Sequence, residues 1–237
     1  MKRFPAKLLI SIILLSGCIP SATAQNSQSR DISGFEAISL EGSFEVFIEE
    51  GARESLRMEG DSETMNKIKT EVRDGTLKIY TERKWWDWKG WIDNGPVNIY
   101  ITYKELNALS VSGSGTIKSE SELRNNSLGL YVSGSGNIQA PINVSSLESH
   151  ISGSGKLVVS GSSGEADIRV SGSGDFSGKN LEVNEAEIHI SGSGNAWLRV
   201  EEELEARISG SGNVHYSGNP VRKSISSSGS GKAIARN

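Results

Sequence analysis

Hydrophobic residues alternate with polar ones along most of the second half of this 237-residue chain. A period of two is typical of β-strands, because successive side chains of a strand point to opposite faces. The alternation surrounds a repeated tetrapeptide, Ser-Gly-Ser-Gly, which starts at positions 112, 133, 152, 171, 191, 209 and 228. A spacing of 18 to 21 residues, kept over seven copies, predicts a solenoid in which each coil buries its apolar side only against its neighbours.

The residues beside the tetrapeptide predict the register of the coils. An aliphatic residue precedes each of the first six copies: Val111, Val132, Ile151, Val170, Ile190 and Ile208. Steps of two lead on to Ile117, Ile138, Leu157, Phe176, Ala196 and Val214. We expect both sets on the inward face, with the serines outward in ladders that continue through Thr116, Asn137, Lys156, Asp175, Asn195, Asn213 and Lys232.

Two interpretations of Ser-Gly-Ser-Gly stay open at this point. If the segment is extended, both glycines point inward, where the missing side chains let the opposite wall approach or the strand bend. Alternatively, the tetrapeptide is a turn between two short strands, since glycine and serine are both turn residues. Periodicity does not separate a bent strand from a turn, and both interpretations predict a β-solenoid.

Charged residues form two further columns in the middle repeats. Four positions before the tetrapeptide stand Glu148, Asp167, Glu187 and Glu205, and two positions before it stand Tyr131, His150, Arg169, His189 and Arg207. Both columns share one face, so we expect exposed pairs worth about 0.2–1 kcal/mol each. A metal or proton site at His150 and His189 is disfavoured, because a whole coil separates them.

Residues 31–105 lack the tetrapeptide but are also rich in predicted strands. Phe35–Ile48 alternates in hydrophobicity, and Val97–Tyr103 has a strand-like composition. The Asp-Gly pair within Glu71–Tyr80 is a hairpin signal. One short helix is predicted over Ser62–Thr70, with Asp61 or Ser62 as its cap.

The sequence therefore predicts an all-β fold. Residues 106–237 form a parallel β-helix, or β-solenoid, of about 19–20 residues per coil, preceded by the strand-rich nonrepeating half at 31–105. The seventh repeat has Ser227 in place of the aliphatic residue. Terminal repeats of solenoids are polar where nothing stacks on them, so 221–237 is predicted to be the last coil and its cap.

The first 24 residues have the features of a secretory signal: three cations, no acid, and the apolar run Leu8–Leu15. Leu15-Ser16-Gly17-Cys18 resembles a bacterial lipobox, in which Cys18 would carry lipid, whereas Ala22-Thr23-Ala24 fits ordinary signal cleavage. We expect export to the outer membrane or periplasm as a lipoprotein, or secretion. The polar residues 25–30 are predicted to be a tether.

Charge and cysteine usage narrow the function classes. Removing residues 1–24 takes away three positive charges, which changes the formal net charge from −4 to −7. This disfavours nucleic acid as a partner, since no basic stripe remains for a phosphate backbone. Cys18 is the only cysteine, so the mature domain has no disulfide and depends on packing and backbone pairing.

Four of the five tryptophans stand in one heptapeptide, Trp85-Trp86-Asp87-Trp88-Lys89-Gly90-Trp91. A projecting tryptophan loop can stack on sugar rings, dock a partner or enter a lipid interface, because indole has a large apolar face and one donor. Alternatively, some of the rings close the end of the β-layer. Candidate ligand contacts are Trp85, Trp86, Trp88 and Trp91.

The sequence contains no arrangement that predicts catalysis. No Gly-x-Ser-x-Gly elbow occurs, and the three histidines are dispersed. Gly172-Ser173-Gly174-Asp175 resembles part of a calcium-binding β-roll repeat, but only this copy has an acid there. We therefore expect no enzyme activity, no catalytic residue, no cofactor and no metal.

The repeated cores Val111–Ile117, Val132–Ile138 and Ile208–Val214, with the strand-rich lead Phe35–Ile38, resemble a family of secreted Bacteroidetes proteins. This is the "putative auto-transporter adhesin, head GIN domain" family, and the resemblance covers nearly all of the mature chain. It implies a parallel β-helix and an adhesive role, but it supplies neither a ligand nor catalytic residues.

The leading hypothesis is a non-enzymatic cell-envelope binding or adhesin-like scaffold, with a glycan or an envelope protein as partner. Contact with a membrane is expected only through a lipid anchor, and the oligomeric state stays open. One alternative is a carbohydrate-active enzyme, which needs two carboxylates about 5–9.5 Å apart across a groove. Another is an envelope lipid-binding protein, which needs an apolar cavity.

Overall fold

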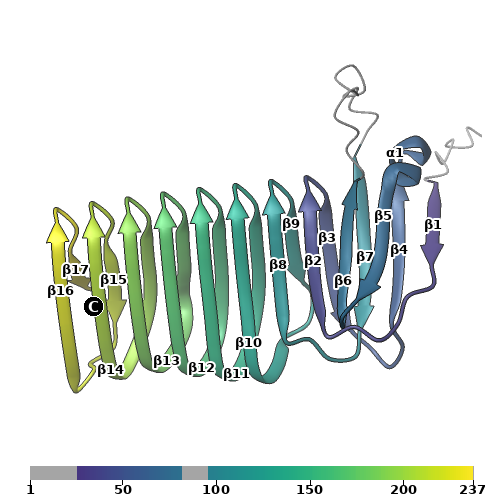
Figure 1. Cartoon of the computed structure of the whole chain (residues 1–237). Coiled ribbons are helices and arrows are strands. Elements are labelled where there is room, and N and C mark those ends of the chain that lie inside the picture. Colours follow the sequence, from purple (N-terminus) through teal and green to yellow (C-terminus); the bar gives the residue numbers. More distant parts are fainter. Residues whose placement is uncertain (1–25, 82–95, 237) are drawn as a thin grey trace, which may run out of the picture.

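The protein is an elongated rod of stacked β-coils (Figure 1). The computed structural model describes residues 26–81 and 96–236. The elements in chain order are β1 (Ser27–Arg30), β2 (Ala37–Gly42), β3 (Glu45–Glu50), β4 (Ser55–Gly60), α1 (Ser62–Lys67), β5 (Ile68–Arg73), β6 (Thr76–Thr81), β7 (Val97–Tyr103), β8 (Ala108–Gly113), β9 (Thr116–Ser119), β10 (Leu123–Gly134), β11 (Asn137–Gly153), β12 (Lys156–Gly172), β13 (Asp175–Gly192), β14 (Asn195–Gly210), β15 (Val214–Ser217), β16 (Arg222–Gly229) and β17 (Ala233–Ala235). Consecutive long strands pair in parallel, which confirms the predicted β-solenoid.

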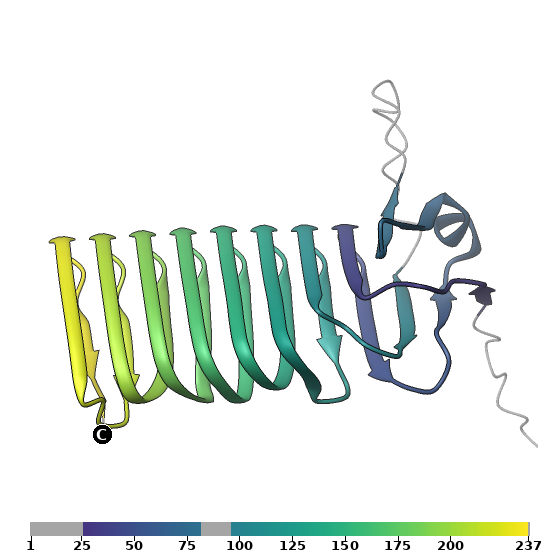
Figure 2. The ribbon, with the colours of Figure 1, turned by 60° about the horizontal axis from the view of Figure 1, so that its bottom comes forward.

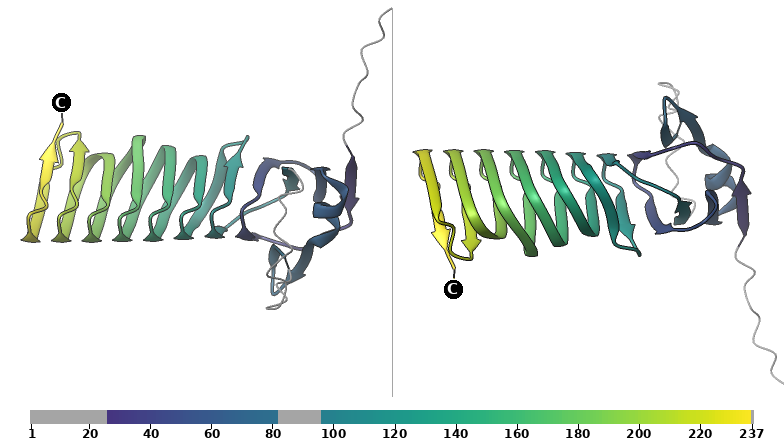
Figure 3. Two further views of the ribbon diagram at one scale, coloured as in Figure 1. Left: turned by 90° about the horizontal axis from the view of Figure 1, so that it is seen from above. Right: turned by 90° about the horizontal axis from the view of Figure 1, so that it is seen from below.

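The long strands bend midway, so each contributes to both faces of the rod (Figure 2). The first sheet contains β5, β6, β2, β8, the last parts of β10 to β14, and β16. The second sheet contains β1, β4, β7, β3, β9, the first parts of β11 to β14, β15 and β17. Seen from above and below, the coils follow one another along a single axis (Figure 3).

Aliphatic side chains fill the space between the two sheets. The residues before the tetrapeptide are buried in every coil up to Ile208, and Val132 lies opposite both Val111 and Ile151 in neighbouring strands. The residues predicted to follow them on the inward face are buried as well. Each buried side chain of this kind contributes about 1.5–3 kcal/mol, so the stacked coils form one continuous core.

The Ser-Gly-Ser-Gly segments are tight turns along one edge of the rod, so the turn interpretation is correct and the extended one is wrong. In the third copy, Gly153 ends β11 with φ at +115°, a conformation that glycine adopts without a steric penalty. Gly155 follows and is buried. Only the second glycine therefore points inward, while the first forms the bend.

Part of the nonrepeating half is a coil in the same register. β2 pairs in parallel with β8, with Gly42 opposite Gly113, and β3 pairs in parallel with β9. Leu40–Val46 is therefore a degenerate copy of the repeat, in which Glu41 and Phe44 replace the first serine and the second glycine. Solenoid stacking begins within the region that the sequence pattern assigns to the nonrepeating half.

Antiparallel strands and one helix close the N-terminal end. The predicted hairpin joins β5 and β6 through Asp74 and Gly75, both with positive φ. The predicted helix is α1, which ends at Lys67 instead of Thr70 because residues 68–70 belong to β5. Its cap Asp61 accepts a bond from the Thr64 amide at 2.8 Å. This bond lowers the pKa of Asp61. Ser27–Arg30 is strand β1 paired with β4, so most of the predicted tether is part of the sheet.

The C-terminal coil leaves the other end of the rod open. Among the described residues, β16 pairs only with β14 and β17 only with β15. All residues from 221 to 230 are exposed, including Ile225. Residues 221–237 therefore include the last coil, as predicted, and this coil is polar where no described element covers its outer edge.

Candidate functional site

One row of outward side chains runs along the second sheet from end to end. The pairing register brings together residues from eleven strand segments: Ser29, Arg57, Tyr100, Phe47, Lys118, Gln139, Val158, Ser177, Trp197, His215 and Ile234. We call this set the outer row. On every strand except the terminal β1 and β17, these members adjoin buried residues, so their side chains face away from the core.

Near the N-terminal end, the outer row forms a stack of two aromatic rings between two cations. The rings of Phe47 and Tyr100 have centroids 5.3 Å apart and planes 16° apart. Arg57 Cζ lies 4.5 Å from the Tyr100 centroid, and Lys118 Nζ lies 5.4 Å from the Phe47 centroid. Cation–π contacts of this kind contribute about 0.5–1 kcal/mol at exposed sites, so both rings are held in place.

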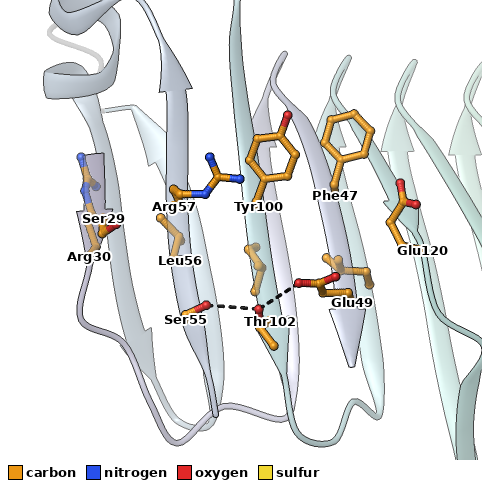
Figure 4. Close-up of a pocket in the computed structure, with 12 residues that line it drawn as sticks. Ser29, Arg30, Phe47, Glu49, Ser55, Leu56, Arg57, Tyr100, Thr102 and Glu120 are labelled. Atoms are coloured by element: carbon orange, nitrogen blue, oxygen red, sulfur yellow. Dashed lines mark hydrogen bonds between the residues drawn. The ribbon is translucent and has the colours of Figure 1, made fainter. Parts of the chain in front are cut away.

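A groove of about 420 Å³ lies beside this stack, and we call it the head groove (Figure 4). Its second wall is a parallel row of polar side chains, Ser55, Thr102 and Glu49. Ser55 Oγ donates to Thr102 Oγ1 at 3.1 Å, and the Thr102 hydroxyl donates to the Glu49 carboxylate at 3.4 Å. The groove therefore has one aromatic wall and one wall of hydroxyl and carboxylate groups.

The charges that line the head groove balance. The lining includes two cations, Arg30 and Arg57, and two acids, Glu49 and Glu120. Arg57 also pairs with Glu59. Arg30 is fixed at one end by bonds of 3.0 Å each to Thr70 Oγ1 and to a main-chain carbonyl of α1. Burial lowers the pKa of Arg30, although arginine stays protonated in proteins. The groove accordingly has donors and acceptors without a large net charge.

The predicted acid–base columns lie on the first sheet, whereas the outer row lies on the second sheet. The predicted pairing is confirmed by contacts of Tyr131 with Glu148, Arg169 with Asp167 and Arg207 with Glu187, at 3.0, 2.6 and 2.7 Å. A hydrogen bond from His189, followed by one from Arg207, lowers the pKa of Glu187. These contacts compensate the charge of this face.

The two column histidines contact arginines of the next coil. His150 Nε2 lies 3.1 Å from an Arg169 nitrogen, and His189 Nε2 lies 3.0 Å from an Arg207 nitrogen. The carboxylate of Asp175, the candidate for calcium, accepts bonds from the backbone and side-chain amides of a stacked asparagine in β14. Within 26–81 and 96–236, no group of three or more His, Cys, Asp or Glu could hold a metal ion.

The contact residues predicted from the sequence, Trp85, Trp86, Trp88 and Trp91, lie outside the described residues, as does the predicted lipidation residue Cys18. The tryptophan segment connects β6, which ends at Thr81, to β7, which begins at Val97. Across the described ranges, no helix is long and apolar enough to cross a membrane.

The sequence predictions missed the outer row, although its signal is present in the repeat. Trp197 and His215 each stand three positions after the second glycine of a tetrapeptide. Phe47 stands three positions after Phe44, which takes the place of that glycine in the degenerate copy. Aligning the repeats on the second glycine identifies these members of the row, whereas Arg57 and Tyr100 join it only through antiparallel and cross-coil pairing.

Comparisons with known proteins agree with this architecture. A family model described as "Putative auto-transporter adhesin, head GIN domain" matches residues 34–220. A putative adhesin from Bacteroides fragilis NCTC 9343 is 21% identical over 91% of this chain and 98% of that chain, with a TM-score of 0.78. A putative lipid binding protein from Parabacteroides distasonis ATCC 8503 is 27% identical over 90% and 98%, with a TM-score of 0.70. No curated protein matches the chain.

Proposed function

Because this chain belongs to the family of the putative auto-transporter adhesin, head GIN domain, we propose that it is an adhesin-like binding scaffold without catalytic activity, whose head groove holds a glycan. The observation that carries this proposal is the pairing of a stacked aromatic wall with a wall of hydroxyl and carboxylate groups on one rigid sheet.

The two walls match the chemistry of a sugar. A sugar ring has apolar C–H faces and a rim of hydroxyl groups, so it suits a site with aromatic surface and a few fixed polar groups. Phe47 and Tyr100 supply aromatic surface through their ring edges, because their faces are covered by each other and by the two cations of the stack. Ser55, Thr102 and Glu49 supply donors and acceptors. These residues stand on strands paired on both sides, so little conformational entropy is lost when a ligand binds.

Hydrolysis of the bound glycan is disfavoured by the surroundings of the two groove carboxylates. A glycoside hydrolase needs one carboxyl group kept protonated by burial as well as a second, ionised one. Both Glu49 and Glu120 line the head groove, but both residues are exposed. We therefore propose binding rather than cleavage, which predicts that no reducing ends are released from glycans that bind.

A lipid is the second candidate ligand, since one similar structure is named a putative lipid binding protein. A lipid tail needs an enclosed apolar cavity. The head groove is open and half of its wall is polar, while the space between the sheets is filled by buried side chains. These features favour a glycan for this chain.

The proposal includes export, which rests on the N-terminal pattern of residues 1–24 and on the adhesin-like family. If Cys18 is the lipidated residue, the mature protein fractionates with the outer membrane and its N-terminal peptide has the mass of an acylated cysteine. A Cys18→Ala variant then becomes soluble in the periplasm. An N-terminus at residue 25 in the wild type would instead establish ordinary signal cleavage.

A glycan array tests the ligand. The wild type is compared with a Phe47→Ala/Tyr100→Ala variant and with Tyr131→Ala, a control that removes a ring from the opposite sheet. We expect the groove variant to lose the specific signal and the control to keep it, with β-sheet circular dichroism intact in both. Loss of signal in both variants, or binding to no glycan by the wild type, would contradict the proposed function.

The tryptophan segment is tested separately on the same array. A variant with alanine at Trp85, Trp86, Trp88 and Trp91 loses binding if these residues contact the ligand, as predicted from the sequence. Unchanged binding by this variant would restrict recognition to the head groove.

A further inference from the structure

The outer row contains a second aromatic stack near its C-terminal end. The rings of Trp197 and His215 have centroids 5.2 Å apart and planes 7° apart. Lys179 Nζ lies 5.4 Å from the Trp197 centroid, and Arg236 Nε donates to His215 Nδ1 at 3.4 Å. The order of cation, ring, ring and cation is thus the same as at the head groove.

A groove of about 470 Å³ lies at this stack, and we call it the tail groove. It is lined by Lys179, Trp197, His215, Tyr216, Ser217 and Arg236, among others. The lining includes aromatic surface, the hydroxyl residues Tyr216 and Ser217, two cations and no carboxylate. The composition therefore differs from that of the head groove, where two acids balance two cations.

The two cations of the tail groove have no carboxylate partner in the part of the chain that the structure describes. Among the described residues, no ion pair includes Lys179 or Arg236, and their contacts are with the rings of Trp197 and His215. By contrast, the nearby Arg199 pairs with Glu201 and Glu182, and the groove-side cations Arg57 and Lys118 at the head each pair with a glutamate. An anion is the group that would satisfy this site.

The imidazole in the stack adds polarity without adding charge. Desolvation, followed by the charges of Arg236 and Lys179, lowers the pKa of His215. The ring is consequently neutral at neutral pH, and the bond from Arg236 assigns Nδ1 as its acceptor. Nε2 then carries the proton and serves as a donor, which again suits an acceptor-rich ligand.

The two grooves lie on one straight track. From Phe47 to Trp197 the outer row crosses five strand-to-strand steps, which at a strand spacing of about 4.8 Å is about 24 Å. The row between them consists of Lys118, Gln139, Val158 and Ser177, none of them an aromatic residue that would obstruct a chain lying along it.

We propose that the tail groove is a second binding site, which takes an acidic sugar residue of a linear glycan whose chain lies along the outer row to the head groove. The acid group accepts charge-assisted hydrogen bonds from Lys179 and Arg236, which are stronger than neutral ones, and Trp197 contacts the sugar ring. The inference rests on the proposed function and specifies its substrate class as a linear, anionic polysaccharide.

Two sites on one rigid face predict a dependence on ligand length. An oligomer that reaches only one groove binds through one site, whereas a chain long enough to span about 24 Å engages both, and its second contact is intramolecular. We expect the affinity to rise at least tenfold once an acidic oligomer exceeds this length.

The test is a calorimetric titration of the purified full chain with oligogalacturonates of increasing length, and with uncharged xylo-oligosaccharides of matched length. A Lys179→Gln/Arg236→Gln variant should bind the long acidic oligomers at least tenfold more weakly and lose most of the salt dependence. The control Lys69→Gln/Lys223→Gln has the same net charge but changes exposed lysines of the first sheet, away from both grooves and from the outer row. We expect it to change the affinity less than twofold.

Each other outcome overturns the proposal. Equal weakening by both double variants would mean that bulk charge, not the tail groove, attracts the ligand. Affinity independent of length would eliminate the track. Binding to phosphatidylglycerol vesicles but not to oligogalacturonates would identify the anion as a lipid head group. Suppose that every variant still binds the acidic oligomers, while Phe47→Ala/Tyr100→Ala abolishes binding of neutral oligomers. This result would leave the proposed function standing and remove this inference alone.

Discussion

Gly155→Ala tests the physical reason for the repeated tetrapeptide. A Cβ at this position would lie 2.4 Å from the Gly136 carbonyl oxygen and 2.4 Å from Val132 Cγ1. Ordinary van der Waals contact begins at 3.4 Å, so both separations are about 1 Å too short. One of the two neighbours is backbone of the preceding coil, which cannot rotate away as a flexible side chain can.

The turn has little freedom to absorb this clash. The Gly155 amide donates to the Gly134 carbonyl at 2.9 Å, and the Lys156 amide donates to the Gly136 carbonyl at 3.0 Å. Overpacking costs about 1–3 kcal/mol, and each weakened hydrogen bond adds about 0.5–1.5 kcal/mol. The smaller entropy of the unfolded alanine chain offsets about 0.4–1 kcal/mol. We expect the free energy of unfolding to fall by about 1–5 kcal/mol.

Gly231→Ala is the matched control, because it has the same clash in a coil that can move. Its Cβ would lie 2.1 Å from the Gly212 carbonyl oxygen and 2.6 Å from Ile208 Cγ2. No described coil stacks on its far side, so the last turn can shift outward, and we expect a loss below about 1 kcal/mol. Urea unfolding followed by far-ultraviolet circular dichroism measures both. Equal losses, or a loss below about 0.5 kcal/mol for Gly155→Ala, would refute the stacking argument.

The remaining predictions concern the core, the pH dependence and the charged columns. Ile208→Ala should lower the free energy of unfolding by about 2–5 kcal/mol, because Ile208 is 2% exposed. Ile225 is 46% exposed in the open last coil, so Ile225→Ala should cost under about 1 kcal/mol. Similar losses for the two variants in urea titrations would contradict the conclusion that the last coil is open. The pKa of Glu187 in the folded protein is lowered from its ordinary value of 4.5. Its ionised carboxylate therefore stabilises the fold above pH 4.5, and this stabilisation is lost as the pH falls through the folded-state pKa. Glu187→Gln should therefore flatten the decline of stability below pH 4.5, and an unchanged slope would contradict this assignment. Arg169→Gln should cost at most about 1 kcal/mol, and the difference from wild type should shrink in high salt, with an undiminished difference counting against an exposed ion pair.

The candidate site shows why a sequence pattern alone falls short of a binding surface. Phe47, Trp197 and His215 share one repeat position, so their common row follows from alignment of the coils. Arg57 reaches the same row from an antiparallel strand, and Tyr100 reaches it from a strand that follows the tryptophan segment. Such residues come together through chain reversal, which leaves no periodic trace in the sequence.

The degenerate first coil escaped prediction for a related reason. Glu41 and Phe44 remove the serine and the glycine by which the tetrapeptide is recognised, yet the backbone hydrogen bonds of β2 with β8 do not depend on those side chains. Ser27–Arg30 is too short and polar to predict as a strand, and it becomes one only because β4 offers an unpaired edge.

The sequence by itself determined the solenoid, its register and the columns of like residues, because an alternation of two and a period near twenty allow only one way for every coil to bury its apolar side. Only the tertiary structure decided that the tetrapeptide turns, that the rod is closed at one end and open at the other, and that two aromatic grooves share one face. These outcomes depend on contacts between coils. There, the close spacing of neighbouring backbones selects the conformation of each turn and strand, and the order of residues along the chain does not reveal that spacing.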